Sequence, residues 1–301
     1  MKVLVTGGAG FIGSHLVDRL IQNDFQVVVL DNLHRGKTEN IKKHMDLGNV
    51  EFINGDIRDF DTVKRAVYNC DTIYHLAAQS NVMGAVHDLD YSFSTNVVGT
   101  FNVLKASQES GARRLIFSSS REAYGEARYL PVDEKHPLSS KNTYGASKVA
   151  GEKYCEVFQN MSTMEVVILR FANVYGERDF DRVIPIFLKN VAGGKDLHIY
   201  GGDQIIDFIS IDAVVDILLQ SMDNDKAPQG PTNVGSGKST TLFDLANCIM
   251  ELSGAKQKVI VDPPRSIEVV RFTADISRLQ KIFNFPVIKD SLFYLNKMIN
   301  R

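Results

Sequence analysis

Short apolar runs alternate with longer segments of helical periodicity through residues 1–175. The runs are rich in valine, leucine and isoleucine and predict strands near residues 2–6, 26–30, 50–54, 71–76, 113–118 and 165–170. Between them, helix-like segments are predicted that include residues 11–22, 60–68, 92–109 and 144–159. Strands that alternate with helices form βαβ units. The pattern therefore predicts an α/β fold with a doubly wound parallel sheet of the Rossmann type, covered on both faces.

The pattern changes after Tyr175, where the predicted elements become shorter and less regular. Turn sequences rich in glycine, proline or asparagine recur there, at residues 193–194, 201–202, 262–264 and 284–286. We therefore predict two domains, a sheet domain over residues 1–175 and a smaller C-terminal substrate-binding domain over residues 176–301. The segment 205–235 is a candidate for returning to the main sheet.

Three glycines follow the first predicted strand and open the first predicted helix. A glycine turn lets the backbone approach a pyrophosphate without a Cβ in the way, and the helix N-terminus offers unpaired N–H groups to the phosphate. Three glycines alone are weak evidence, because such spacing also arises by chance. The residues predicted to line this dinucleotide site are Gly7, Gly10, Phe11, Ile12 and Gly13.

The end of the second predicted strand supports the prediction of a dinucleotide site. It ends at Asp31, about twenty residues after the glycines, where a carboxylate can accept hydrogen bonds from both hydroxyls of the adenosine ribose. A negative charge there also repels a 2′-phosphate, which favours NAD over NADP. The alternative is that Asp31 only begins a turn with Asn32.

Composition and charge narrow the classes of partner. The 34 basic residues nearly balance the 36 acidic ones, so there is no positive surplus for binding nucleic acid or an anionic membrane. No apolar run approaches the ~20 residues of a membrane span, and Met1 and Lys2 lead directly into the first strand, so no signal peptide is expected. The spacing of the three cysteines, Cys70, Cys155 and Cys248, is not that of metal ligands, so no metal site is expected. Three cysteines also suit free thiols, which favour a cytoplasmic location.

Tyr144 and Lys148 form a candidate general base. They lie four residues apart at the start of a predicted helix, which places their side chains on one face, about 5 to 6 Å apart at Cβ. Lowering the pKa of a tyrosine from about 10 to 7 takes roughly 4 kcal/mol of phenolate stabilisation. A lysine ammonium and an oxidised nicotinamide can supply it. The spacing alone is not specific, but the pair follows a strand that ends in Ser118–Ser120, where ligands of parallel sheets bind.

Taken together, these motifs resemble those of the extended short-chain dehydrogenase/reductases, and more narrowly the nucleotide-sugar epimerases and dehydratases. The resemblance covers nearly the whole chain and implies NAD as cofactor, a nucleotide-diphosphate sugar as substrate and a homodimer. The matching segments are Thr6–Gly13, Asp31–Leu33, Gly55–Ile57, His75–Ala78, Asn96–Thr100, Ser118–Ser120, Tyr124–Gly125, Tyr144–Lys148, Arg170–Gly176, Thr232–Gly237 and Ala274–Ser277.

The resemblance also implies roles for individual residues. Ser120 would hydrogen-bond the sugar hydroxyl that is oxidised, and Lys148 would bind the nicotinamide ribose and tune Tyr144. Further cofactor contacts would come from Asp31, Asn32, Asp56, Ile57, Leu76, Ala77, Ala78, Asn96 and Ser118. Substrate contacts would come from Asn173, Val183, Tyr200 and Arg265. Without the resemblance, Asn173 would be interpreted as a turn residue and Arg265 as a solvated charge.

The reaction implied first is 4-epimerisation through a transient 4-keto sugar, with Tyr144 as the base. A 4,6-dehydratase or a decarboxylase using Glu122 is the alternative, although Arg121 cannot serve as the acid that a dehydratase needs there. Glu122 can equally be a carboxylate paired with a nearby arginine. A third hypothesis is a non-catalytic NAD-binding regulator, which would need no base.

One departure from the family pattern concerns the substrate diphosphate. Family members typically carry an arginine where this chain has Ile206, so one of two expected phosphate contacts is missing. Either Arg182 or Arg178 replaces it, or the substrate is bound more weakly or differs in kind.

Overall fold

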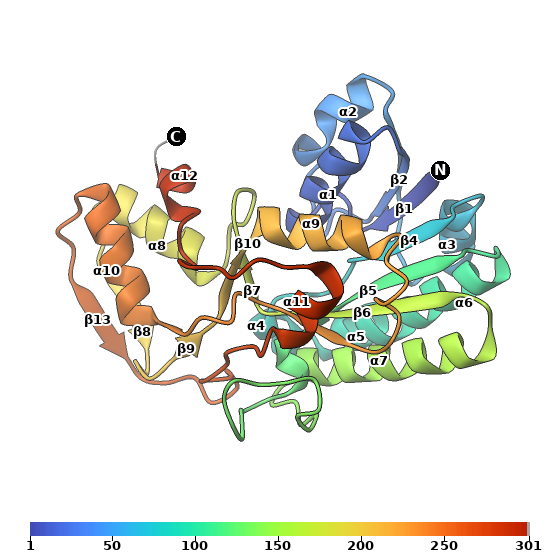
Figure 1. Cartoon of the computed structure of the whole chain (residues 1–301). Coiled ribbons are helices and arrows are strands. Elements are labelled where there is room, and N and C mark those ends of the chain that lie inside the picture. Colours follow the sequence, from blue (N-terminus) through green and yellow to red (C-terminus); the bar gives the residue numbers. More distant parts are fainter. Residues whose placement is uncertain (300–301) are drawn as a thin grey trace.

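The computed structural model describes residues 1–299 and contains a central parallel sheet of seven strands (Figure 1). Their spatial order is β11-β6-β5-β4-β1-β2-β3, and every neighbouring pair runs parallel. The strands are β1 (Lys2–Thr6), β2 (Gln26–Asp31), β3 (Val50–Asn54), β4 (Thr72–His75), β5 (Arg114–Ser120), β6 (Glu165–Phe171) and β11 (Thr232–Val234). This confirms the predicted α/β class and the doubly wound sheet.

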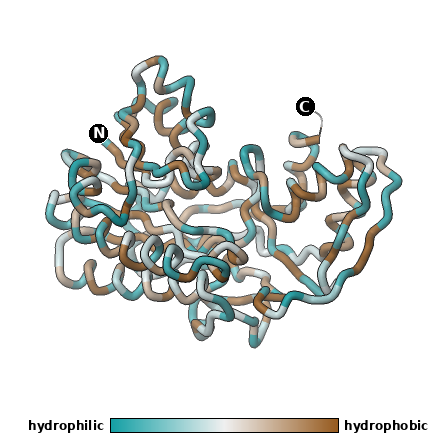
Figure 2. Tube along the Cα trace, turned by 180° about the vertical axis from the view of Figure 1, so that it is seen from behind, coloured by the Kyte–Doolittle hydropathy of each residue, from teal (hydrophilic) through white to brown (hydrophobic). Residues whose placement is uncertain are grey.

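Helices cover both faces of the sheet because successive strand side chains point to opposite sides. Val3 and Val5 of β1 pack with helices α1 (Phe11–Gln22) and α9 (Ile211–Ser221), whereas Leu4 packs on the other side. That second face is covered by α3 (Phe60–Val67), α6 (Thr100–Glu109) and α7 (Thr143–Met161). Figure 2 shows hydrophobic and hydrophilic residues alternating along the helical turns, as expected of helices that turn only one side to the sheet.

The helix predicted over residues 92–109 is divided in the structure. It consists of the end of α5 (Leu89–Phe93), a π-helical turn η2 (Ser94–Gly99) and α6. The wider turn carries Asn96, whose side chain accepts a hydrogen bond from the Gln79 backbone N–H at 2.7 Å and so joins η2 to the loop after β4. Single π-helical turns of this kind occur frequently at functional sites.

The second half of the chain is not one contiguous domain. Within segment 205–235, α9 packs on α1, and β11 pairs with β6 at the edge of the main sheet. Helix α11 (Ser277–Phe283) packs against β11 (Figure 1). The smaller unit contains α8 (Val183–Ala192), α10 (Leu242–Ser253), α12 (Leu295–Ile299) and three two-stranded sheets, which pair β7 (Asn173–Tyr175) with β10 (Phe208–Ser210), β8 (Leu197–Tyr200) with β13 (Val259–Asp262), and β9 (Ile205–Ile206) with β12 (Thr240–Thr241).

Two short α-helices and two 3-10 turns belong to the connections that matter for the site. These are α2 (Lys42–Asp46) and η1 (Thr38–Asn40) after β2, α4 (Val82–His87) after β4, and the 3-10 turn η3 (Arg121–Ala123) directly after β5. Because all strands of the sheet are parallel, the loops that follow β1, β2, β4 and β5 gather at one edge. The loop between β7 and α8 reaches the same edge from the smaller unit, as its hydrogen bonds to Arg35 and Asn81 show.

Candidate active site

A cavity of about 630 Å³ lies at this edge, between the sheet and the smaller unit. Of all the residues that the sequence analysis assigned to the site, only Asp56 and Asn96 lie outside its lining. The cavity extends from the glycine turn after β1, past the end of β5, to Tyr200 and Arg265. The fold therefore brings the predicted cofactor, catalytic and substrate residues to one continuous space.

The glycine turn has the geometry that a dinucleotide phosphate requires. Gly7 has a φ of +72°, and a Cβ on it would lie 2.8 Å from the Ala77 backbone nitrogen. A Cβ on Gly13 would overlap the Gly7 carbonyl oxygen, so the first turn of α1 can pack this closely only with glycine. Gly10 caps α1 without a side-chain hydrogen bond, which leaves the first N–H groups of the helix for a phosphate. The residues present therefore fit NAD.

Asp31 begins a turn and lines the cavity at the same time. Its carboxylate accepts hydrogen bonds from the backbone N–H groups of Leu33, at 2.8 Å, and Ala9, at 3.0 Å. Burial raises the pKa of Asp31, and these two hydrogen bonds oppose that rise. Each carboxylate oxygen keeps a second acceptor position for a ribose hydroxyl. The turn interpretation and the cofactor interpretation are thus compatible.

Asp56 lies behind the cavity rather than in its wall. Its carboxylate is held by Arg58, with Nε at 2.9 Å, and by the Asn32 side-chain amide at 2.8 Å. The wall itself is formed by Asn32, His34 and Tyr91, and the rings of the last two lie 4.5 Å apart. Sequence reasoning missed His34 and Tyr91, because nothing in their local pattern distinguishes them from other loop and helix residues.

Asn96 also lies outside the cavity lining, where its side chain bonds residues that carry the lining. Its amide nitrogen donates to Ser147 Oγ at 3.0 Å, and Ser147 in turn donates to the Tyr144 carbonyl at 2.7 Å. Together with the bond to Gln79, this arrangement ties the loop after β4 to the first turn of α7. Asn96 therefore positions the segment that carries Tyr144.

The predicted catalytic residues converge where β5 meets α7. The helix begins after Asn142, whose side chain accepts a hydrogen bond from Gly145 N–H at 2.9 Å. Tyr144 lies in its first turn, and the Nζ of Lys148 is 5.7 Å from the centre of the Tyr144 ring. Lys148 donates to the Ser118 carbonyl at 2.7 Å. Ser120, at the end of β5, lines the same cavity, and its hydroxyl helps to lower the pKa of Tyr144.

The electrostatics around Tyr144 differ from the sequence expectation. Burial raises the pKa of Tyr144 to about 12, and the effects that oppose burial come from the charge of Arg182, the hydrogen bond to Ser120 and the charge of Arg35. Burial also lowers the pKa of Lys148 to about 8, which weakens the positive charge expected to tune the phenol. The acidic phenol predicted from Lys148 is therefore not a property of these protein groups alone.

Glu122 lies in the cavity wall but both of its carboxylate oxygens are engaged. One forms an ion pair with Arg121 at 3.0 Å, and the other accepts from the Asn142 amide at 2.7 Å. Its backbone N–H donates to Ser120 Oγ at 3.2 Å. The arrangement is the one expected of a carboxylate paired with a neighbouring arginine.

The substrate side of the cavity contains the other predicted contacts. Asn173 begins β7, Val183 begins α8, and the Arg265 guanidinium stacks on the Tyr200 ring with 3.6 Å from Cζ to the ring centre. Arg265 also pairs with Glu268 at 3.0 Å. The Asn173 side-chain oxygen is buried and has no hydrogen-bond partner within residues 1–299, so it can accept one from a ligand.

The structure distinguishes the two arginines proposed to replace the one absent at position 206. Arg182 lines the cavity, as does Ile206 itself. Arg178 instead forms an ion pair with Asp18 at 2.7 Å, outside the cavity lining. Of these two, only Arg182 is placed to meet a ligand in the cavity.

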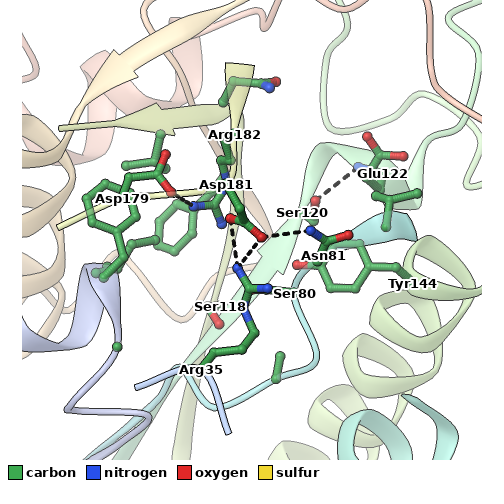
Figure 3. A pocket seen from close by; sticks show the side chains of 18 of the residues that line it. Arg35, Ser80, Asn81, Ser118, Ser120, Glu122, Tyr144, Asp179, Asp181 and Arg182 are labelled. Atoms are coloured by element: carbon green, nitrogen blue, oxygen red, sulfur yellow. Dashed lines mark hydrogen bonds and ion pairs between the residues drawn. The ribbon is translucent and has the colours of Figure 1, made fainter. Parts of the chain in front are cut away.

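A network of loop residues that the sequence did not indicate crosses the cavity (Figure 3). Both oxygens of the Asp181 carboxylate accept from Arg35 at 2.8 Å, and one also accepts from the Asn81 amide at 2.7 Å. Asp179 accepts from Arg182 at 2.8 Å. These residues come from three loops far apart in the chain, and no local sequence signal joins them.

The sequence comparison places these features in a known family. A model of the NAD-dependent epimerase/dehydratase family matches residues 3–235. The chain belongs to this family. Membership makes it an NAD-dependent enzyme that acts on nucleotide sugars, which sets aside the hypothesis of a non-catalytic regulator.

Relatives in this epimerase/dehydratase family are similar over nearly their full length. A putative UDP-glucose 4-epimerase of Methanocaldococcus jannaschii is 38% identical over 287 residues, which cover 93% of this chain and 92% of the relative. The crystal structure of the Thermotoga maritima UDP-glucose 4-epimerase with UDP-glucose has a TM-score of 0.91 and 32% identity, covering 99% of this chain and 100% of that one.

Other members of the family that resemble this chain carry different activities in their names. One is the dTDP-glucose 4,6-dehydratase DesIV of Streptomyces venezuelae, crystallised with NAD bound. Its structure has a TM-score of 0.93 at 27% sequence identity, and the match covers 100% of this chain and 96% of that chain. UDP-glucuronic acid decarboxylases are also among the similar proteins. Family membership thus establishes the cofactor and the class of substrate, but it does not establish which reaction the enzyme catalyses. No helix within residues 1–299 combines the length and apolarity needed to span a membrane.

Proposed function

We propose that this enzyme is a nucleotide-sugar 4-epimerase that works through a transient 4-keto sugar. The supporting observation is the state of the residues that follow β5. Ser120 and Tyr144 both line the cavity, and the Ser120 hydroxyl helps to lower the pKa of Tyr144, whereas the Glu122 carboxylate is bound on both oxygens. Elimination of water by a 4,6-dehydratase would need Glu122 free as a base and also an acid, which Arg121 cannot supply because its guanidinium does not deprotonate.

Each catalytic side chain has a defined task in this reaction. Tyr144 accepts the proton of the sugar C4 hydroxyl, and Ser120 hydrogen-bonds the same oxygen as its bond order changes. NAD, when bound, exchanges a hydride with C4. Lys148 adds positive charge beneath the Tyr144 ring and fixes the end of β5 through Ser118. The 4-keto sugar turns over in the cavity so that it presents its other face to the cofactor site, and Tyr144 then returns the proton to the C4 oxygen.

Incubation with a panel of nucleotide sugars tests this proposal. Purified enzyme is incubated separately with UDP-glucose, UDP-N-acetylglucosamine, UDP-glucuronic acid and dTDP-glucose, and the products are identified by NMR. The expected result is the C4-inverted sugar from one or more of them. A stable 4-keto-6-deoxy product would instead establish a dehydratase, and release of carbon dioxide from UDP-glucuronic acid a decarboxylase.

We further propose that the enzyme is a cytoplasmic homodimer. The three cysteines are free, as expected in a reducing compartment. Helices α6 and α7 present exposed apolar side chains on the outer face of the sheet domain, at Phe101, Tyr154, Val157 and Met161. A second copy of the chain, packed on this face, would remove these side chains from water.

A further inference from the structure

Residues 177–182 lie between β7 and α8 of the smaller unit and reach the loops of the cofactor site. Four of them line the same cavity as the glycine turn, namely Asp179, Phe180, Asp181 and Arg182. Asp181 makes the contact with the sheet domain. Its carboxylate accepts hydrogen bonds from Arg35 on both oxygens at 2.8 Å, and from the Asn81 amide at 2.7 Å. Figure 3 shows Arg35 and Asn81 pointing to Asp181 from two separate loops.

We propose that Asp181 is a positioning residue that joins the smaller unit to the loops of the cofactor site and thereby slows the release of NAD. Arg35 follows β2 and Asn81 follows β4, so their contacts with Asp181 connect the two sides of the cavity. The two units can separate at this point only when these hydrogen bonds break. The inference concerns the cofactor and does not depend on which sugar reaction the enzyme catalyses.

The ion pair between Asp181 and Arg35 is well placed to hold two elements together. The two side chains are only 23% and 24% exposed, so water and salt screen their attraction less than on an open surface. Burial raises the pKa of Asp181, but hydrogen bonds from Arg35 and Asn81 outweigh burial and lower it below its ordinary value. The carboxylate is therefore charged at neutral pH. The neighbouring Asp179 and Arg182 pair with each other at 2.8 Å.

Further contacts fix both partners of Asp181. The side-chain oxygen of Asn81 accepts from the Gly84 N–H at 2.9 Å at the start of α4, which orients the amide nitrogen. The guanidinium carbon of Arg35 lies 5.1 Å from the centre of the Phe180 ring, and Lys37 Nζ lies 5.2 Å from the same ring. The loop after β2 thus meets the segment through two neighbouring residues.

The rate of NAD release tests the proposal without turnover. The enzyme is loaded with radiolabelled NAD, an excess of unlabelled NAD is added, and the label that remains on the protein is followed by gel filtration. The variants are Asp181→Asn, Arg35→Gln and the double variant. Arg19→Gln is the matched control, because it removes an ion pair of 2.7 Å with Asp216 that joins α1 to α9 within the sheet domain. The measurement uses no sugar, so its failure is distinct from a failure of the proposed epimerase reaction.

We expect Asp181→Asn and Arg35→Gln each to speed the release of NAD about 10- to 100-fold, because each removes a charge-assisted hydrogen bond between the two units. The double variant should release NAD no faster than the faster single variant, since both changes act on the same contact. Arg35→Lys, which keeps the charge, should release NAD more slowly than Arg35→Gln. Arg19→Gln should match the parent.

Three results would overturn the proposal. The first is equal release of NAD from Asp181→Asn and the parent. The second is faster release from Arg35→Gln but not from Asp181→Asn, which would mean that Arg35 binds the cofactor directly. The third is faster release in proportion to a lowered melting temperature, in Arg19→Gln as well as in the two variants, which would assign the effect to general stability.

Discussion

Tyr144 is the residue on which the proposed chemistry depends, and its surroundings show how the protein prepares it. It is buried, the Ser120 hydroxyl helps to lower its pKa, and Asn142 fixes the start of its helix. Burial alone would make the phenol a poor base, since it disfavours the charged form. The site therefore needs nearby positive charge, which comes from Arg182 and Arg35 and, when it is bound, from the oxidised cofactor.

Replacing Tyr144 with phenylalanine tests this assignment most directly. The change removes the hydroxyl that accepts the proton and keeps the ring that packs beside Lys148. We expect kcat to fall about 10²- to 10⁴-fold, while NAD content and melting temperature stay close to those of the parent. The measurements are steady-state kinetics, the absorbance of released cofactor and thermal melting. Substantial activity in this variant would mean that another group takes the proton.

At the scale of elements, the turn between β1 and α1 depends on two glycines that nearly touch. A Cβ on Gly13 would overlap the Gly7 carbonyl, so the helix must move away from the strand to accommodate it. We expect Gly13→Ala to destabilise folding by about 1–3 kcal/mol and to reduce bound NAD sharply. Gln22→Ala, at the exposed far end of the same helix, is the control and should change neither quantity. Denaturant unfolding and cofactor content would measure both effects.

The ends of β1 and β4 are joined by a buried histidine. His75 accepts a hydrogen bond at Nδ1 from the Thr6 hydroxyl and donates from Nε2 to Thr100, because the Thr100 hydroxyl is used as the donor to Asn96. Burial, together with the smaller effect of the Lys148 charge, lowers the pKa of His75 to about 3. The neutral ring thus links two strands and α6 beneath the cofactor site.

This histidine predicts a specific loss of stability in acid. The unfolded chain binds a proton at His75 below about pH 6.5, whereas the folded protein does so only below about pH 3. Between these values the unfolded state holds more protons, so the free energy of unfolding falls as pH falls, by at most about 1.4 kcal/mol per pH unit. Chemical denaturation from pH 7 to pH 4 should show a smaller slope for His75→Gln. An unchanged slope would contradict this account.

At the scale of the whole molecule, the two faces of the sheet have different surroundings. Helices α1 and α9 cover one face beside the smaller unit, whereas α6 and α7 cover the other and leave apolar side chains exposed. We expect Val157→Glu, on α7, to convert the proposed dimer to a monomer by placing a charge in its interface. Light scattering coupled to size-exclusion chromatography would measure the mass. Gln22→Glu, on α1 at the opposite face, should leave it unchanged.

The sequence alone determined the sheet and the glycine turn, and it predicted the candidate catalytic pair, Tyr144 and Lys148. Apolar runs of strand length and segments of helical spacing are local signals, and the parallel order follows from their alternation. Gly7 follows β1 directly, Asp31 and Ser120 end their strands, and Tyr144 lies in the first turn of a helix, so their place at one edge was predictable. The local pairing of Glu122 with Arg121 was also foreseeable, since the two residues are neighbours.

Only the tertiary structure decided which residues face the cavity and which charges act on Tyr144. Asp56 and Asn96 lie behind the wall, where they bond residues of neighbouring loops, and Arg35, Asn81 and Asp181 meet from three separate loops. Arg182 and Arg178 are four residues apart, yet only Arg182 lines the cavity. Electrostatic effects depend on distance and burial in space, and the spacing of residues along the chain records neither.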